Sequence, residues 1–396
     1  MDINEKLERL AARIGDGATV RVMIFGLGSV GAYLLDYFLS WPEENVEIHV
    51  CGRSLEKMVL EVNICRVANL IRHGSCKNIV CHQLDLNDPA AIGQVIGTVE
   101  PDFLVNSSRV YSGLKYGSIS WKSLRSYGLW SPLAAKYIRN IMMGSTHSSG
   151  RGILINTSYA DVVNCWLKSY GLPAPDFGSG NLNHLIPRIK LAVAALTSID
   201  SQLVDVVLAT SHFHDVVISK EGHSEGVAPL LYIGYGGHAV NVDVNEIYRN
   251  CAIPMPVDSK RNMMNASSNF EIVARIVGAI KNRSNALLHS PGVVGKIGGY
   301  PVAIDFRPGA AASRRFSLIE TYFSAEEMEK HNRLSISLDG IENVSEGVVT
   351  FTAALVEKVQ RAFAVAVPRQ IHLDSIDEMA DILINRIIVP NVGSVA

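Results

Sequence analysis

The sequence lacks the features of a membrane protein and of a nucleic-acid-binding protein. Its 396 residues contain no apolar run that approaches a bilayer span, and the N-terminal stretch MDINEKLERLAARI carries charges where a signal peptide would need an apolar core. Charged residues make up 19% of the chain, the formal net charge is −2, and no run of Lys and Arg forms a basic patch. We therefore expect a globular, cytoplasmic protein without a membrane or nucleic-acid partner.

Cysteine is also scarce, and its spacing argues against a metal centre. None of the six cysteines forms a C-x-x-C pair. Cys76 and Cys81, with His73 and His82, come nearest to a ligand cluster, but they straddle the predicted start of a strand and lack zinc-finger spacing. We predict no metal site and expect the thiols to be reduced.

What the sequence does contain is a glycine-rich turn between a strand and a helix. The apolar stretch Val20 to Phe25 leads into Gly26, Gly28 and Gly31, which have G-x-G-x-x-G spacing, and the apolar AYLLDYFL follows. In such a turn the first glycine permits the bend, the second lets backbone approach a pyrophosphate, and the third allows close helix packing. The phosphates then lie at the positive N-terminus of the helix. The residues predicted to bind a dinucleotide here are Gly26, Gly28, Ser29, Val30 and Gly31. The alternative is a turn of the same shape without a ligand.

The end of the second strand indicates which dinucleotide is bound. After Val46 to Val50 the chain continues with Cys51, Gly52, Arg53 and Ser54, where an acidic residue would accept hydrogen bonds from a ribose. A guanidinium and a hydroxyl suit a 2′-phosphate, whereas a carboxylate would repel it. We therefore predict NADP(H) rather than NAD(H), with Gly52, Arg53 and Ser54 as cofactor-binding residues. The alternative is that Arg53 is a solvated loop charge.

Further strands alternate with helices and end in polar residues. A third strand, Asn78 to Leu86, ends near Asp85; a fourth, Phe103 to Val105, leads into Asn106, Ser107 and Ser108; and Gly152 to Ile155 leads into Asn156. This alternation predicts a doubly wound parallel sheet of the Rossmann type, with these polar residues at its cofactor edge. We place this domain at residues 1–160. An α/β domain with a mixed sheet, for catalysis and oligomerisation, is expected at 161–396.

The stretch Arg109 to Leu129 differs from its surroundings because it has no clean period and is rich in Tyr, Ser, Gly, Lys and Trp. One interpretation is a mobile loop that carries Arg109, Lys115 and Arg125 over the cofactor. The other is a surface loop with solvated cations.

The middle of the chain resembles the lactate and malate dehydrogenase superfamily. The residues that carry the resemblance are INTSYADVVNCWLKSYGLPAPDFGSGNLNHLIPRIKLAVAAL and the strand-like VDVVLATSHFHD, and the order of elements agrees over roughly the first 300 residues. The resemblance implies that Asn156 touches the nicotinamide amide and the substrate, and that Arg188 holds the substrate carboxylate. It also implies that His212 transfers the proton. A guanidinium pairs with a carboxylate through two hydrogen bonds, and an imidazole exchanges a proton near neutral pH.

The chain departs from the family pattern around the histidine. The acidic partner of the catalytic histidine would fall near Asn183, His184 and Leu185, none of which is a carboxylate. If the strand continues, His212 and His214 point the same way, so His214 is a second candidate for the acid/base. His223 is considered as a polar ligand of the substrate. Because Pro187 precedes Arg188, we place Arg188 in the first turn of a helix.

We predict an NADP(H)-dependent oxidoreductase that moves hydride between nicotinamide and a carbonyl carbon adjacent to a carboxylate. A saccharopine- or opine-type reductase acting on a carbon–nitrogen bond, in the biosynthesis of a specialised metabolite, is the first alternative. A dinucleotide-sensing protein without catalysis is the second. The amphipathic stretch Ser375 to Ile387 packs on its own domain or on a second subunit, and we expect a homo-oligomer, either a dimer or a tetramer.

Overall fold

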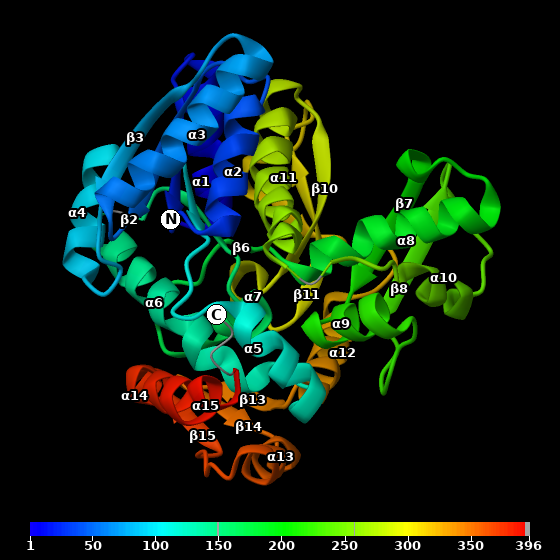
Figure 1. Cartoon of the computed structure of the whole chain (residues 1–396). Helices are drawn as coiled ribbons and strands as arrows, with labels where there is room; N and C mark the ends of the chain where they lie inside the picture. Colours follow the sequence, from blue (N-terminus) through cyan, green and yellow to red (C-terminus); the bar gives the residue numbers. More distant parts are fainter. Residues whose placement is uncertain (149, 257, 393–396) are drawn as a thin grey trace.

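A six-stranded parallel sheet forms the centre of the computed structural model, which describes residues 1–148, 150–256 and 258–392 (Figure 1). The strand order is β3-β2-β1-β4-β5-β6, so the order in which the chain adds strands reverses between β1 and β4, while the two strands stay parallel. The doubly wound parallel sheet is therefore confirmed. Its strands are β1 (Val20–Phe25), β2 (Val46–Gly52), β3 (Asn78–Gln83), β4 (Phe103–Asn106), β5 (Ile153–Asn156) and β6 (Phe177–Gly178).

Both faces of this sheet are buried, and β1 shows why its sequence is apolar throughout. Val22 and Ile24 belong to one hydrophobic cluster, whereas Met23 and Phe25 belong to another on the opposite face, and all four side chains are buried. Alternate side chains of a strand point to opposite faces, so helices must cover both. The helices that follow the strands are α2 (Ser29–Ser40), α3 (Leu55–His73), α4 (Pro89–Val99), α6 (Ser131–His147) and α7 (Ala160–Ser169), and α1 (Ile3–Gly15) precedes them.

The second half of the chain builds three small sheets, which are antiparallel in every pairing of the described residues. The predicted mixed sheet was therefore wrong. Each of these sheets contains a short connection between neighbouring strands, and a short connection allows only antiparallel pairing. The strands are β7 (Val204–Ala209), β8 (Leu230–Tyr235) and β9 (His238–Ala239); β10 (Asn285–Pro291), β11 (Gly299–Asp305) and β12 (Phe316–Leu318); and β13 (Ile341–Ser345), β14 (Val348–Phe351) and β15 (Gln370–His372).

Helices connect these sheets to the Rossmann half. Helix α11 packs on α2, and the lobe built from α8, β7, β8 and α10 extends to the right in Figure 1. The C-terminal stretch lies against α6, where Asp377 pairs with Lys136 and Arg139 at 2.9 Å each. The helices are α8 (Asn181–Thr197), α9 (His212–Glu221), α10 (Val244–Cys251), α11 (Asn262–Lys281), α12 (Ala325–Leu338), α13 (Ala353–Phe363), α14 (Ile376–Ile382) and α15 (Val389–Val392).

Four local predictions were wrong or incomplete. Residues 109–129 are largely helical rather than a loop, with α5 (Gly113–Ile119) followed by a π turn over 120–124. The chain after β7 turns into α9 at His212 instead of continuing as a strand. Pro187 lies inside α8, so Arg188 is in its second turn rather than its first. The sheet continues past residue 160, because β6 pairs with β5.

Among the described residues, no helix combines the length and apolar character needed to cross a membrane. All six cysteines are free thiols.

Candidate active site

The turn between β1 and α2 has the geometry that its three glycines predict. Gly26 has a φ of +90°, and a Cβ there would lie 2.9 Å from the Cβ of Ser108. A Cβ on Gly31 would lie 2.1 Å from the carbonyl oxygen of Gly26, so only glycine allows α2 to pack this closely. Gly28 caps α2 and faces open space. The turn therefore presents bare backbone and a helix N-terminus, which suit a pyrophosphate.

The residues after β2 and β3 lie outside the cavity described below. Ser54 accepts a hydrogen bond from the backbone N–H of Lys57 as the N-cap of α3, and the Arg53 side chain is exposed. Asp85 accepts a hydrogen bond from the backbone N–H of Asn87. The phosphate-recognition role of Gly52, Arg53 and Ser54 stays a prediction, as does the cofactor role of Asp85.

The ends of β4 and β5 are tied together by buried amides. Asn106 donates to Asn156 Oδ1 at 3.0 Å, and Asn156 Nδ2 donates to Asn164 Oδ1 at 2.8 Å. Ser108 donates to Asn106 Oδ1. Ser107 donates to the carbonyl of Gly26 at 2.8 Å and is the member of this group that lines the cavity. The Asn156 amide is thus bonded within the protein and stands behind the cavity wall.

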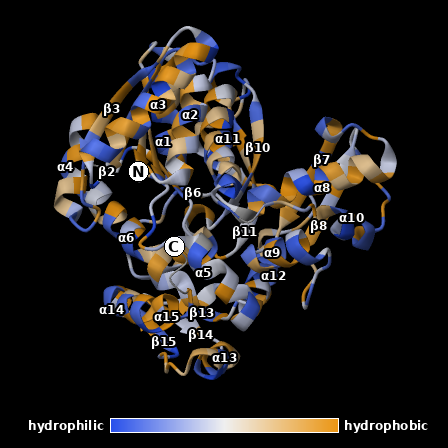
Figure 2. Ribbon diagram, in the orientation of Figure 1, coloured by the Kyte–Doolittle hydropathy of each residue, from blue (hydrophilic) through white to orange (hydrophobic). Residues whose placement is uncertain are grey.

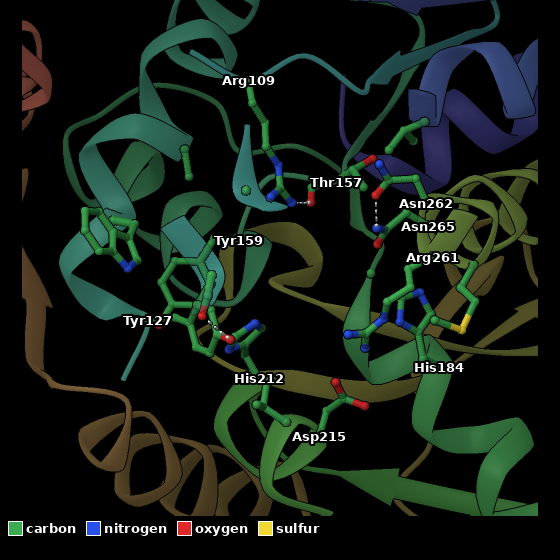
Figure 3. A pocket seen from close by; sticks show the side chains of 18 of the residues that line it. Arg109, Tyr127, Thr157, Tyr159, His184, His212, Asp215, Arg261, Asn262 and Asn265 are labelled. Carbon is green, nitrogen blue, oxygen red and sulfur yellow. Dashed lines mark hydrogen bonds between the residues drawn. The ribbon is translucent and has the colours of Figure 1, made fainter. Parts of the chain in front are cut away.

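A cavity of about 770 Å³ lies beside this edge of the sheet (Figure 3). Gly28, Ser29 and Val30 of the glycine turn form one side of it, and His212 and Arg188 belong to its lining. It therefore joins the predicted cofactor site to two of the predicted catalytic residues. Its other charged or polar lining residues include Arg109, Lys122, Tyr127, Thr157, Tyr159, Asp161, Ser179, His184, Asp215, Lys220, Arg261, Asn262 and Asn265.

His212 has an acidic partner after all, supplied by a distant part of the chain. Its Nδ1 lies 3.1 Å from Oδ2 of Asp339, which is the residue after α12 and is fully buried. The same carboxylate accepts hydrogen bonds from the Tyr159 hydroxyl and the Tyr127 backbone N–H, both at 2.7 Å. The position that the family pattern would assign to this acid is near Asn183, which instead caps α8. No local signal marks Asp339, because 127 residues separate it from His212.

The charges around His212 determine its protonation. Burial lowers the pKa of His212, but the hydrogen bond and charge of Asp339, with the nearby Asp161 and Asp215, outweigh burial and raise it above its usual value. Burial raises the pKa of Asp161 to about 6, and the positive charge of His212 partly offsets this. An acid beside an imidazole favours the imidazolium form, so the site can keep His212 protonated near neutral pH.

Arg188 reaches the cavity from the middle of α8. Its guanidinium donates to the carbonyl of Cys251 at 2.7 Å and lies 3.1 Å from the sulfur of Met255, and the residue is 4% exposed. Its Nε has no partner among the described residues. The carbonyls at the end of α10 therefore hold the guanidinium at the cavity wall, where it can receive an anion.

His214 and His223 do not reach the cavity. His214 is fully buried, with Nδ1 2.7 Å from the Ser335 hydroxyl and Nε2 2.9 Å from the carbonyl of Glu225. Side chains two residues apart in a helix point to different sides, and α9 starts at His212, so the side chains of His212 and His214 diverge. The expectation that His212 and His214 point the same way was therefore wrong. The exposed His223 contacts Glu225 instead.

One group of side chains in the described residues has the spacing of metal ligands, namely Glu221, His223 and Glu225. Both carboxylates form ion pairs with the guanidinium of Arg125, and His223 contacts Glu225. The cluster is therefore an ion-pair network on the surface.

A short 3₁₀ turn and the helix α11 that follows it bring three residues to the cavity that the sequence did not indicate. Arg261 ends the 3₁₀ turn (Ser259–Arg261), and Asn262 and Asn265 lie at the start of α11. Asn262 donates to the hydroxyl of Ser29 at 2.5 Å and thereby connects α11 to the glycine turn. The polar residues at the start of α11 mask its helical period. A cluster of amides and a cation just before an apolar helix was the available signal.

The segment from 109 to 130 closes another side of the cavity. Arg109 donates to the carbonyl of Thr157 at 3.4 Å, as Figure 3 shows, and α5 follows directly. Lys115 and Arg125 are not among the lining residues. The segment is therefore a largely helical wall rather than a mobile loop, and only the expected contact of Arg109 with the cofactor stays a prediction.

Comparison with known proteins identifies the fold. No protein-family profile and no curated protein sequence matches the chain, but solved structures match most of its length. The malate dehydrogenase of Cryptosporidium parvum has a TM-score of 0.51 and 13% sequence identity, over 81% of this chain and 98% of its own. The chain has the fold of malate and lactate dehydrogenases.

Two further solved structures match the chain over most of its length. The Cryptosporidium parvum lactate dehydrogenase, complexed with lactic acid and nicotinamide adenine dinucleotide, has a TM-score of 0.52 and 12% identity over 81% of this chain and 98% of its own. The Plasmodium falciparum malate dehydrogenase has a TM-score of 0.50 and 12% identity over 87% of this chain and 99% of its own. The resemblance expected from the sequence is confirmed at the level of the fold.

Proposed function

We propose that the protein is an NAD(P)-dependent oxidoreductase that moves hydride between nicotinamide and a carbonyl carbon next to a carboxylate. The observation that carries this proposal is the His212–Asp339 pair, whose histidine lines the same cavity as the backbone of the glycine turn. Solved structures with this fold include malate and lactate dehydrogenases, one of them complexed with lactic acid and nicotinamide adenine dinucleotide, which supports the same class of reaction.

Proton transfer and carboxylate binding are assigned to different residues of the cavity. Asp339 holds His212 through Nδ1, and Nε2 makes no hydrogen bond within the described residues, so Nε2 is the nitrogen that exchanges a proton with the substrate oxygen. Arg188 receives the carboxylate and orients the carbonyl carbon. A bound nicotinamide supplies or accepts the hydride. The open backbone at Gly28 and the N-terminus of α2 fit its pyrophosphate.

NADP(H) is the proposed cofactor, with NAD(H) as the alternative. Arg53 is exposed at the end of β2, and its side chain has no hydrogen bond or ion pair within the described residues, so its guanidinium is able to meet a 2′-phosphate.

The test is the oxidation of NADPH and NADH by the purified chain with a panel of 2-oxo acids. We expect turnover with at least one acid, and a loss of at least about a hundredfold in His212→Asn, because general acid–base catalysis contributes factors of this size. His214→Asn is the matched control and should retain activity if it folds. Turnover that survives His212→Asn would contradict the proposed role. Tight cofactor binding without any turnover would favour the sensing alternative.

We further propose that the chain forms a homo-oligomer, with α3 in the contact between copies. Seven large apolar side chains on this helix are exposed, among them Ile64 at 65% and Ile71 at 80%, and Figure 2 shows apolar residues along it. Glu61 lies in its first half and Arg66 in its second, so two antiparallel copies would pair opposite charges. Light scattering should report a smaller mass for Ile64→Glu. An unchanged mass would exclude this face.

The cytoplasmic location remains a proposal and is supported by the six unpaired thiols.

A further inference from the structure

Asp215 is a buried carboxylate without a cationic partner. It lies in the first turn of α9, three residues after His212, is 4% exposed, and lines the cavity. The Ser219 hydroxyl donates to its Oδ1 at 3.2 Å. No cationic side chain of the described residues lies within ion-pair distance of it. Figure 3 places it below His212 and Arg261 at the border of the cavity.

This arrangement costs stability. Burial raises the pKa of Asp215 to about 7, although the positive charges of His212 and Arg188 partly offset it. Buried carboxylates are normally paired, because an unpaired charge loses its hydration. A single hydroxyl satisfies only part of what an ionised carboxylate can accept. The cavity side of Asp215 is thus built to receive a donor that the protein itself does not supply.

Three guanidinium groups line the same cavity, those of Arg109, Arg188 and Arg261, and the latter two influence Asp215. Arg188 is held by backbone carbonyls, and the Arg261 side chain makes no hydrogen bond or ion pair within the described residues. Arg188 and Arg261 both act on the pKa of Asp215 through their charge, so the three groups are electrostatic neighbours. A cavity that holds guanidinium groups and a carboxylate without an ion-pair partner, Asp215, is complementary to a ligand with both an anion and a cation.

We propose that the substrate carries a positively charged N–H group in addition to its carboxylate, and that Asp215 receives this group. This inference rests on the proposed function and narrows its substrate class. The cation has two possible chemical sources: a protonated imine, in which the carbon that takes the hydride is bonded to the charged nitrogen, or an ammonium or guanidinium elsewhere on a 2-oxo acid.

Both sources give balanced reactions. With a protonated imine, hydride from the reduced nicotinamide forms a C–H bond, the π pair of the C=N bond moves onto nitrogen, and the products are an amine and oxidised nicotinamide. With a keto group, hydride forms the same C–H bond and the carbonyl oxygen takes a proton from His212. In each case Asp215 holds the N–H cation and takes no part in the electron flow.

The experiment measures binding, so that it does not depend on turnover. The full chain, saturated with NAD⁺ or NADP⁺, is titrated calorimetrically with two matched pairs of product-like acids. The comparison of proline with tetrahydrofuran-2-carboxylate tests the imine source, because proline has a charged N–H group in its ring where the other acid has a neutral oxygen. 2-Hydroxy-5-guanidinopentanoate against its ureido counterpart tests a cation on the side chain. The variants are Asp215→Asn and, as a matched control, Asp205→Asn, whose carboxylate is exposed on β7.

We expect the cationic member of one pair to bind at least about tenfold more tightly than its neutral partner, as hydrogen bonds between charged groups allow. Asp215→Asn should remove that preference while leaving the neutral ligand unaffected, and Asp205→Asn should preserve it. If the oxidised cofactor binds, then equal binding within both pairs, or a preference that survives Asp215→Asn, overturns this inference and leaves the proposed function standing. If neither NAD⁺ nor NADP⁺ binds, the proposed function fails as well.

Discussion

The pair formed by His212 and Asp339 permits a quantitative test of the proposed chemistry. Asp339→Asn keeps the size of the side chain and removes the negative charge that lies 3.1 Å from Nδ1 of His212. Hydrogen bonds to charged groups contribute about 1.5–3 kcal/mol, which corresponds to a fall of roughly 10- to 150-fold in kcat/KM. We expect the fall mainly in kcat, because Asp339 acts on His212 and does not line the cavity.

The pH dependence of the same variant gives a second, independent measure. Burial lowers the pKa of His212, and Asp339, with the charges of Asp161 and Asp215, more than compensates, so the net pKa is raised. Reduction of a carbonyl needs protonated His212, so the rate falls as the pH rises through this pKa. Without the charge of Asp339 the pKa of His212 falls. The alkaline loss of reductase activity should therefore begin at a lower pH in Asp339→Asn than in the wild type.

The assay follows NAD(P)H oxidation across neutral pH with the best 2-oxo acid of the panel, with thermal unfolding as a check that the variant is folded. Asp377→Asn is the matched control, because it changes a carboxylate on α14 that pairs with Lys136 and Arg139 far from the cavity. It should leave the pH profile unchanged. A profile of Asp339→Asn that coincides with that of the wild type would refute the assigned role of Asp339.

Three further predictions concern the cofactor turn and the buried acid. Gly31→Ala places a Cβ 2.1 Å from the Gly26 carbonyl, so we expect a lower melting temperature and loss of NADPH binding by fluorescence titration, whereas Gly28→Ala, in open space, should fold normally. Arg53→Ala should weaken NADPH about tenfold and leave NADH unchanged, because charge-assisted hydrogen bonds are of this strength; equal effects on both would exclude a 2′-phosphate contact. Because burial raises the pKa of Asp215 to about 7, ionising this carboxyl destabilises the folded state, and the destabilisation develops as the pH rises from about 4 through 7. Asp215→Asn should therefore stabilise the protein by about 1–4 kcal/mol at alkaline pH and less in acid, measured by urea unfolding; a pH-independent effect would contradict this.

Local sequence determined the elements and the turn chemistry. The alternation of strands and helices, with glycines at 26, 28 and 31, predicts the parallel sheet and its open turn, because strand burial and left-handed backbone are local properties. The family resemblance proposed Arg188 and His212 as catalytic residues, and both line one cavity in the structure, although their roles stay a prediction. The strands, helices and glycine turn follow from short stretches of chain, whereas the meeting of these two side chains does not.

Only the tertiary structure decided which side chains meet. Asp339 reaches His212 because α12 packs on α9, and no periodicity within either helix encodes that contact. Asn156 faces Asn106 and Asn164 rather than the cavity, because the neighbouring strand and α7 offer partners for its amide. Arg261 joins the cavity through the docking of α11 on α2. Contacts between residues far apart in sequence depend on the packing of whole elements, so the sequence by itself determined the scaffold, and packing determined the site's electrostatics.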